Sequence, residues 1–224
     1  MKIISVLRCG REYTVRHAQW LHRQLSGYDS LCMTDAKSIP GVQTAPLLYD
    51  WPKWFAKLEA FNPDRTDTGG EDLLLLDIDT VITGDLSPFL QPRPFTTLTD
   101  FYYEDTPQPP MASGVMYIPA EMKHVVWEKF MSNPSRWIRE RHPMPHHGDG
   151  GFISRAITQR SQRWQEILPG SVVSYKRDIA SQEMPGYHPL RSTGDGTVPD
   201  AARIVCFHGN PRPWNVIAPF IPGL

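Results

Sequence analysis

The sequence predicts an α/β domain built on a mostly parallel central sheet flanked by helices. Short apolar segments alternate with amphipathic segments along the chain, which is typical of proteins that build parallel sheets. Residues 73–76 are four consecutive leucines, and such a run is typical of a strand covered on both faces. Proline makes up 22 of the 224 residues, which argues against a helical bundle because each interior proline costs a helix about 3 kcal/mol.

The first third of the chain shows strand, helix, strand, loop and helix patterns in that order. Residues 3–7 are apolar and rich in branched side chains, which predicts a buried strand. Apolar residues at helical spacing predict a helix over 14–25, and 28–34 is a second strand candidate. Residues 35–52 hold four prolines or glycines and are expected to form a loop, whereas 54–61 has aromatic and leucine residues at helical spacing.

The remaining two thirds of the chain continue this alternation. Apolar runs predict strands, and apolar residues three or four positions apart predict helices. Because the alternation continues, and because domains of this size are common, one large domain is favoured over two small ones. The expected strands are 73–76, 95–99, 114–118, 172–175 and 203–207, and the expected helices are 121–131 and 150–158.

Composition and charge exclude several classes of protein. With 23 basic and 24 acidic residues the formal charge is -1, so no global positive field attracts nucleic acid or an anionic membrane. No stretch approaches the length of about 18 apolar residues that a membrane span needs, and the apolar run at the N-terminus is too short for a signal peptide. Three widely separated cysteines argue against a disulfide framework and favour a reducing compartment. We therefore expect a cytoplasmic protein that is not integral to a membrane and does not bind nucleic acid.

Two aspartates directly follow the leucine strand. Ligands of open α/β sheets bind beyond the carboxyl ends of the strands, and Asp77 and Asp79 stand at that place. Side chains two positions apart point to the same side of an extended backbone, so the two carboxylates are expected to lie together. Unpaired, they would be costly beside an apolar strand, and a hard divalent cation such as Mn2+ or Mg2+ would remove that cost. The alternative is that both aspartates are solvated turn residues.

An Asp-x-Asp pair after a strand is typical of two enzyme classes. Haloacid-dehalogenase-type phosphatases use the first aspartate, here Asp77, as a nucleophile. That fold usually begins with its Asp-x-Asp strand, whereas about seventy residues precede the strand here. GT-A glycosyltransferases instead place the pair after a nucleotide-binding half.

Five segments, taken in order, resemble motifs of the GT-A nucleotide-sugar transferases, and are nearest to glycosyltransferase family 8, which contains glycogenin and bacterial galactosyltransferases. They are FAKL at 55–58, LLLLDIDTVITGDL at 73–86, SGVMYI at 113–118, HGDGGF at 147–152 and FHGNPRPW at 207–214. The resemblance spans residues 1 to about 215. It implies one GT-A-like domain over 1–224, with a nucleotide-binding half over 1–80 that ends in the Asp-x-Asp pair and a sugar and acceptor half over 81–224.

The resemblance implies a role for each matched residue. Asp77 and Asp79 would hold the metal, and Arg212 would lie on the distal phosphate in place of the family's lysine. Lys57 would reach the phosphate or the sugar, with a surface lysine as the structural alternative. Asp149 would contact the sugar or face the anomeric centre, although it is equally well placed to cap a helix.

Two family positions are altered in this chain. Cys206 stands three residues before Gly209, where the family has its metal-binding histidine, and Gly150 stands where glutamine is usual. His208 lies one residue before Gly209, so Cys206 and His208 share a face if this stretch is a strand. Imidazole suits Mn2+ or Mg2+ better than a soft thiolate does, so we expect His208 to complete the metal site.

The donor is expected to extend from the metal to the end of the first strand. Arg8 and Tyr13 would lie near the nucleotide base, and Tyr13 could stack on it or could be a rim tyrosine of the core. Ile78 and Gly209 would complete the nucleotide-sugar site.

These features predict a metal-dependent hexosyltransferase that moves a sugar from a UDP-sugar to an acceptor, and the resemblance to family 8 implies retention of configuration. The expected catalytic residues are Lys57, Asp149 and Arg212. No motif in the sequence identifies the acceptor, which is a glycan, a lipid-linked group or a protein. Two alternatives stay open: a non-catalytic module that binds a sugar nucleotide or glycan, and a phosphatase that uses Asp77.

Overall fold

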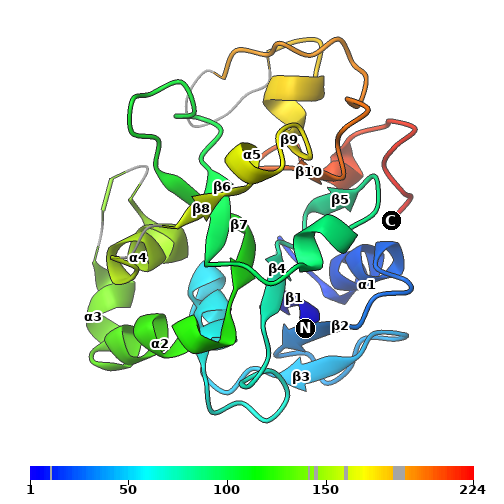
Figure 1. Ribbon diagram of the computed structural model, residues 1–224. Coiled ribbons are helices and arrows are strands. Elements are labelled where there is room, and N and C mark those ends of the chain that lie inside the picture. Colours follow the sequence, from blue (N-terminus) through cyan, green and yellow to red (C-terminus); the bar gives the residue numbers. More distant parts are fainter. Residues whose placement is uncertain (11, 141, 144–145, 159–160, 184–189) are drawn as a thin grey trace.

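The structure of the protein is a computed structural model that describes residues 1–224 except 11, 141, 144–145, 159–160 and 184–189. Within the described residues, the central layer is a seven-stranded sheet with the strand order β3–β2–β1–β4–β7–β6–β8 (Figure 1). A second sheet, with the order β5–β10–β9, lies at the upper right in the same view. Strands alternate with helices and four of the six strand pairings in the large sheet are parallel, so the predicted α/β class is confirmed.

The parallel part of the sheet comes from the first strands of the chain. β1 (Lys2–Leu7) pairs with β2 (Ser30–Thr34) on one side and with β4 (Leu73–Leu76) on the other, and β3 (Thr44–Pro46) extends the sheet beyond β2. The carboxyl ends of these strands therefore meet at one edge of the sheet. β3 lies within 35–52, where the sequence predicts a loop, because a three-residue edge strand is too short to produce an alternating pattern.

The other part of the sheet is mixed. β7 (Met111–Ile118) runs antiparallel between β4 and β6 (Thr96–Thr99), and β8 (Gln162–Arg163) pairs in parallel with β6. Because β7 is antiparallel to β4, the beginning of β7 lies beside the end of β4, and the Asp77 backbone N–H donates to the Gly114 carbonyl at 2.9 Å. This reversal brings the start of β7 to the same edge of the sheet as the two aspartates.

The four leucines of β4 divide between two hydrophobic cores. Leu74 and Leu76 pack into one core and Leu73 and Leu75 into the other, and all four are fully buried. Successive side chains of a strand point to opposite faces, so an unbroken apolar run is what a strand between two cores needs. The prediction that this strand is covered on both faces is confirmed.

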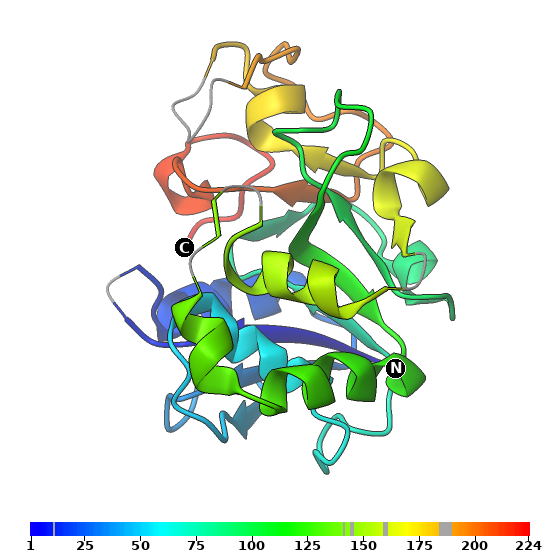
Figure 2. The same cartoon turned by 90° about the vertical axis from the view of Figure 1, so that its left-hand side faces the viewer.

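Helices cover both faces of the large sheet. α1 (Val15–Gln24) contributes to the core that contains Leu74, whereas η1 (Lys53–Phe61), α2 (Lys123–Met131) and α4 (Gly148–Ala156) contribute to the core that contains Leu75. α2 and α4 face the viewer in Figure 2. Among the described residues, no helix combines the length and the apolar character that a membrane crossing needs.

Several helical segments differ from the sequence prediction. The helix predicted over 54–61 is the 3-10 helix η1, and α4 begins at Gly148, two residues before the predicted start. The helix predicted over 121–131 begins as a 3-10 turn, η3 (Ala120–Met122), and continues as α2. The remaining short segments are η2 (Ser87–Leu90), α3 (Pro134–Arg139), α5 (Trp164–Ile167), the π-helix η4 (Tyr175–Ile179) and η5 (Pro213–Asn215).

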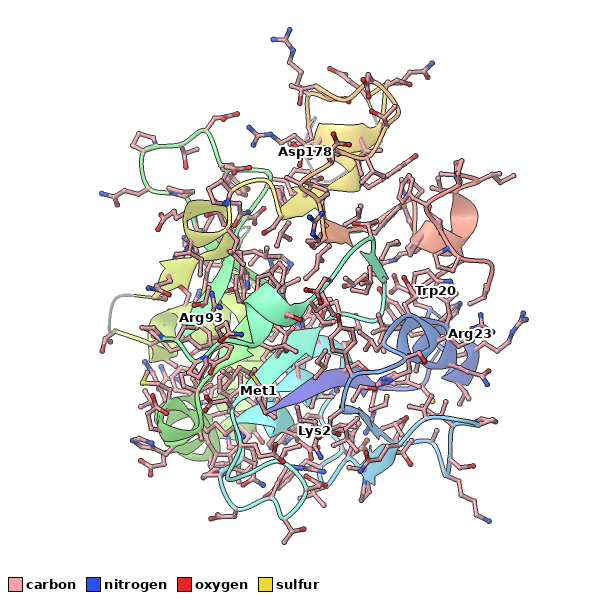
Figure 3. All side chains as sticks on the ribbon, turned by 45° about the vertical axis from the view of Figure 1, so that its right-hand side comes forward. Met1, Lys2, Trp20, Arg23, Arg93 and Asp178 are labelled. Carbon is pink, nitrogen blue, oxygen red and sulfur yellow. The ribbon has the colours of Figure 1, made fainter. Side chains whose placement is uncertain are left out.

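The small sheet connects the middle of the chain to its C-terminal part. β10 (Ile204–Cys206) is antiparallel to β5 (Thr80–Ile82) and parallel to β9 (Val172–Ser174). Cys206 lies opposite Thr80, so the segment that follows β10 emerges beside Asp79. The C-terminal segment then crosses α1, where Trp20 and Arg23 donate to the carbonyls of Pro222 and Gly223 at 2.8 and 2.9 Å (Figure 3).

Candidate functional site

The Asp-x-Asp pair lies in the short connection between the two sheets. β4 ends at Leu76 and β5 begins at Thr80, so Asp77 and Asp79 sit where the chain passes from one sheet to the other. The Thr80 N–H donates to the Asp77 carbonyl at 3.2 Å, which fixes this connection as a turn. The Asp77 side chain keeps 36% of its surface exposed, whereas that of Asp79 keeps 7%. The pair therefore forms one wall of a site that is open on the Asp77 side.

Lys57 connects Asp77 to Asp149. Its ammonium lies 3.0 Å from Asp77 Oδ1 and 2.9 Å from Asp149 Oδ2, and it donates to Ser113 Oγ at 3.2 Å. Ser113 in turn donates to Asp149 Oδ2 at 2.8 Å. The four side chains come from η1, the β4 end, α4 and the start of β7, so the fold brings together residues that are up to 92 positions apart in sequence.

Burial and charge oppose each other in this network. Burial alone would lower the pKa of Lys57, but the charges of Asp149 and Asp77 hold it above its ordinary value. Burial raises the pKa of Asp77 to about 6, against the opposing effect of the Lys57 charge. Lys57 is therefore charged and bridges two carboxylates. A surface lysine would instead be solvated, so the structural alternative for this residue does not apply.

Arg212 binds the other aspartate. Its guanidinium forms ion pairs with Asp79 and with Glu12, and it lies over the ring of Tyr13 with 5.1 Å between the guanidinium carbon and the ring centroid. Tyr13 Oη donates to Asp79 Oδ2 at 3.1 Å. Burial raises the pKa of Asp79 although Arg212 acts in the opposite direction. Arg212 Nε is buried and has no hydrogen-bond partner among the described residues.

His208 lies four residues before Arg212 and packs against Phe101 and Tyr102. Its Nε2 is 2.6 Å from Ser174 Oγ, and its ring stacks on Phe101 and meets the edge of Tyr102. Burial, together with the nearby charges of Lys176 and Arg212, lowers the pKa of His208 to about 3. His208 is therefore neutral at pH 7, and within the part of the chain that the structure describes its buried Nδ1 has no hydrogen-bond partner.

Cys206 lies close to the two aspartates. It pairs with Thr80, the residue after Asp79, in the small sheet. Burial and then the charges of Asp79 and Asp77 raise the pKa of the Cys206 thiol well above its ordinary value, so the thiol keeps its proton at neutral pH. Within the described residues, no group of three or more His, Cys, Asp and Glu side chains forms a metal cluster. The expected triad of Asp77, Asp79 and His208 therefore stays a prediction.

The residues expected near the nucleotide base are held by protein partners. Arg8 forms an ion pair with Asp35 over 3.4 Å and another with Asp50, at the carboxyl end of β1. Tyr13 directs its hydroxyl to Asp79 and meets the edge of Trp214, with 5.9 Å between the ring centroids. Base contacts by Arg8 and Tyr13 stay predictions.

The two remaining donor residues differ in what they can offer. The Ile78 side chain is buried in the core, so a ligand would meet the backbone at this position. Gly209 has a φ of +79°, a left-handed conformation that favours glycine, and it leads the chain from His208 toward Arg212. Donor contacts by Ile78 and Gly209 stay predictions.

Sequence reasoning missed four polar residues of this site. Ser113 lies within the matched segment 113–118, which implies no role for it, and Glu12 adjoins the predicted Tyr13. Ser174 and Lys176 follow one another closely at the end of β9, where no local pattern marks them. Their positions depend on the pairing of β9 with β10, which is set by contacts between distant parts of the chain.

The fold argues against the phosphatase reading. β4, which carries Asp77, is preceded in the chain by β1, β2 and β3, whereas that class of fold usually begins with its Asp-x-Asp strand. Asp77 is also paired with Lys57 in this structure.

No protein-family model and no curated protein sequence matches the chain. Solved structures do resemble it. The galactosyltransferase LgtC, in complex with donor and acceptor sugar analogues, aligns with a TM-score of 0.59 and 11% identity over 96% of this chain and 89% of LgtC. The apo form of the glycosyltransferase GlyE from Streptococcus pneumoniae TIGR4 aligns with a TM-score of 0.51 and 15% identity over 73% of this chain and 45% of GlyE.

The bifunctional glycosyltransferase WbbM aligns with a TM-score of 0.58 and 10% identity over 95% of this chain and 46% of WbbM. The chain thus spans most of LgtC but less than half of GlyE and of WbbM. At these identities a structural likeness shows the fold and no more. The chain has the GT-A-like fold of these glycosyltransferases, in agreement with its predicted resemblance to family 8.

Proposed function

We propose that this protein is a glycosyltransferase that transfers a sugar from a nucleotide-sugar donor, a UDP-sugar, with Mn2+ or Mg2+ as cofactor. The observation that supports the proposal is the partly buried charge cluster at the end of β4, where Asp77 pairs with Lys57 and Asp79 pairs with Arg212. Arg212 Nε lacks an acceptor among the described residues, and leaving a buried donor unsatisfied costs about 1–3 kcal/mol. A phosphate oxygen of the donor would supply that acceptor.

The side chains at the site fit a divalent cation. Asp77 and Asp79 offer hard oxygen ligands, and burial raises the pKa of both, so a cation beside them would stabilise their charged forms. His208 offers a neutral imidazole whose Nδ1 lacks a partner within the described chain, and Cys206 is the competing third ligand. When bound, the cation would neutralise charge on the departing nucleoside diphosphate.

Other residues at the site would bind the phosphate and contact the sugar. Arg212, oriented by Asp79 and Glu12, would bind the distal phosphate and meet the charge that grows there as the sugar leaves. Lys57 and Ser113 hold Asp149 in one orientation, with Asp149 Oδ2 accepting from both. A fixed carboxylate of this kind could accept hydrogen bonds from the hydroxyls of the sugar.

Thermal stability in the presence of UDP tests this proposal. UDP with Mn2+ should raise the melting temperature of the wild-type protein by roughly 5–10 °C at a hundredfold excess over Kd, because a ligand that binds only the native state stabilises it. The shift should need the metal and should disappear in Asp79→Asn. Asp200→Asn, which changes an exposed aspartate, serves as the matched control. Absence of any UDP effect with Mn2+ and with Mg2+ would remove the proposal.

A second function, binding of a sugar nucleotide without transfer, is favoured by one observation. Gly150 and Cys206 replace two residues that the resemblance assigns to the site. Release of UDP from a panel of UDP-sugars separates the two functions. Slow, metal-dependent release supports transferase chemistry, and the configuration of the first sugar released, followed by NMR, tests retention. Tight UDP binding with no release supports the binding module.

A further inference from the structure

Lys176 is a buried lysine near the proposed donor site, and no local sequence pattern marks it. It lies on η4, which directly follows β9, and only 1% of the residue is exposed. Lysine is rarely buried to this degree unless its charge has a function or a partner. Asp178, labelled in Figure 3, marks η4 at the top of the molecule.

The ammonium of Lys176 is directed at the turn that carries Gly209. A Cβ atom on Gly209 would lie 3.7 Å from Lys176 Nζ, so the absence of a side chain leaves the turn open on this side. Lys176 Nζ also donates to Tyr102 Oη at 3.3 Å. The Tyr102 hydroxyl thus helps to hold the lysine at the turn.

Two cations lie near this turn, Lys176 beside Gly209 and Arg212 three residues further along the chain. The nearby charge of Arg212 lowers the pKa of Lys176 further than burial alone, and both cations act on His208. Buried like charges repel, and their proximity is stabilised when an anion binds between them. Arg212, three residues after Gly209 in the chain, also has a buried Nε with no hydrogen-bond partner among the described residues. The Lys176 ammonium, the unsatisfied Arg212 Nε and the turn at Gly209 are together suited to bind an anion.

We propose that Lys176 is a second phosphate-binding residue, which contacts the terminal phosphate of a nucleoside diphosphate opposite Arg212. This inference rests on the proposed function, because it assumes that a nucleoside diphosphate occupies the site. It adds a contact that the Asp-x-Asp pair and the C-terminal motif do not provide. The contact is specific to the terminal phosphate, so it favours UDP over UMP.

Isothermal titration with UDP and with UMP, both in Mn2+, tests the inference. Lys176→Met removes a charged hydrogen bond to the terminal phosphate of UDP. The loss of such a bond should weaken UDP binding about 10- to 100-fold. UMP binding should change less than about twofold, because UMP lacks the terminal phosphate. Lys176→Arg, which keeps the charge, should retain most of the UDP affinity, and the exposed Lys37→Met is the matched control.

The outcomes separate this inference from the proposed function. If the wild type binds neither nucleotide, the proposed function fails and the inference fails with it. If the wild type binds UDP and Lys176→Met binds it equally well, or loses UDP and UMP affinity to the same extent, only the inference is overturned. Should Lys176→Met not fold, Tyr102→Phe removes the hydroxyl that positions the ammonium. It should then weaken UDP binding severalfold without affecting UMP, and an unchanged preference for UDP over UMP would overturn the inference.

Discussion

At the scale of single residues, the site depends on a lysine shared by two carboxylates. Lys57 contacts Asp77 and Asp149 at once, and the side chains of Lys57 and Asp149 are 11% and 9% exposed. Removing one partner of a buried ion pair leaves an uncompensated charge, which costs more than the pair itself contributes. The balance of charge here is therefore sensitive to each of the three residues.

The first prediction concerns this balance. Lys57→Met should lower the free energy of unfolding by about 3 kcal/mol, because Asp149 would stay buried without its cation. Adding Asp149→Asn should restore part of the loss, with a coupling energy of about 1–3 kcal/mol between the two changes. Urea unfolding of the two single variants and the double variant measures the coupling. Strictly additive effects would show that the two side chains do not interact as the structure indicates.

At the scale of secondary-structure elements, the sequence predicts what is local and misses what is distant. The β4 leucines are predicted and confirmed because four apolar residues in a row identify a buried strand without further information. β5 is missed because its three residues follow the Asp-x-Asp pair, and its pairing with β10 joins positions 80 and 206. This pairing places Cys206 at the site, and the pairing of β9 with β10 places Lys176 there, so neither position could be read from local patterns.

His22 shows how one helix is attached to the sheet. It lies on α1, is 7% exposed, and forms hydrogen bonds with Ser5 Oγ of β1 at 2.8 Å and with Ser30 Oγ of β2 at 3.0 Å. Burial lowers the pKa of His22 from 6.5 to about 4. The charged form of His22 is therefore disfavoured in the folded state but not in the unfolded state.

The second prediction follows from the sign of this shift. Between about pH 6.5 and pH 4 the unfolded state binds a proton that folded His22 does not, so stability falls as pH falls through this range. The contribution of His22 between pH 7 and pH 5 is about 2 kcal/mol. His22→Gln should flatten the curve of unfolding free energy against pH by that amount, and the exposed His124→Gln should not. An equally steep curve in His22→Gln would contradict the assignment.

At the scale of the whole molecule, one strand connects the two hydrophobic cores. β4 contributes Leu74 to the core that also holds Trp20 and Trp164, and Leu75 to the core that holds Trp51 and Trp127. Neither core can loosen without exposing a face of the same strand. This arrangement predicts that the chain unfolds as one cooperative unit, as expected for a single domain over 1–224.

The third prediction tests this cooperativity from both faces of β4. Leu74→Ala and Leu75→Ala each remove a fully buried side chain, so each should lower the free energy of unfolding by about 2–5 kcal/mol. In both variants, far-UV circular dichroism and tryptophan fluorescence should report the same urea midpoint, because the cores melt together. Two separate transitions, with only one shifted by each variant, would instead show that the two cores unfold independently of each other. A coincident transition would show that both cores unfold together with β4, the strand that Asp77 and Asp79 directly follow.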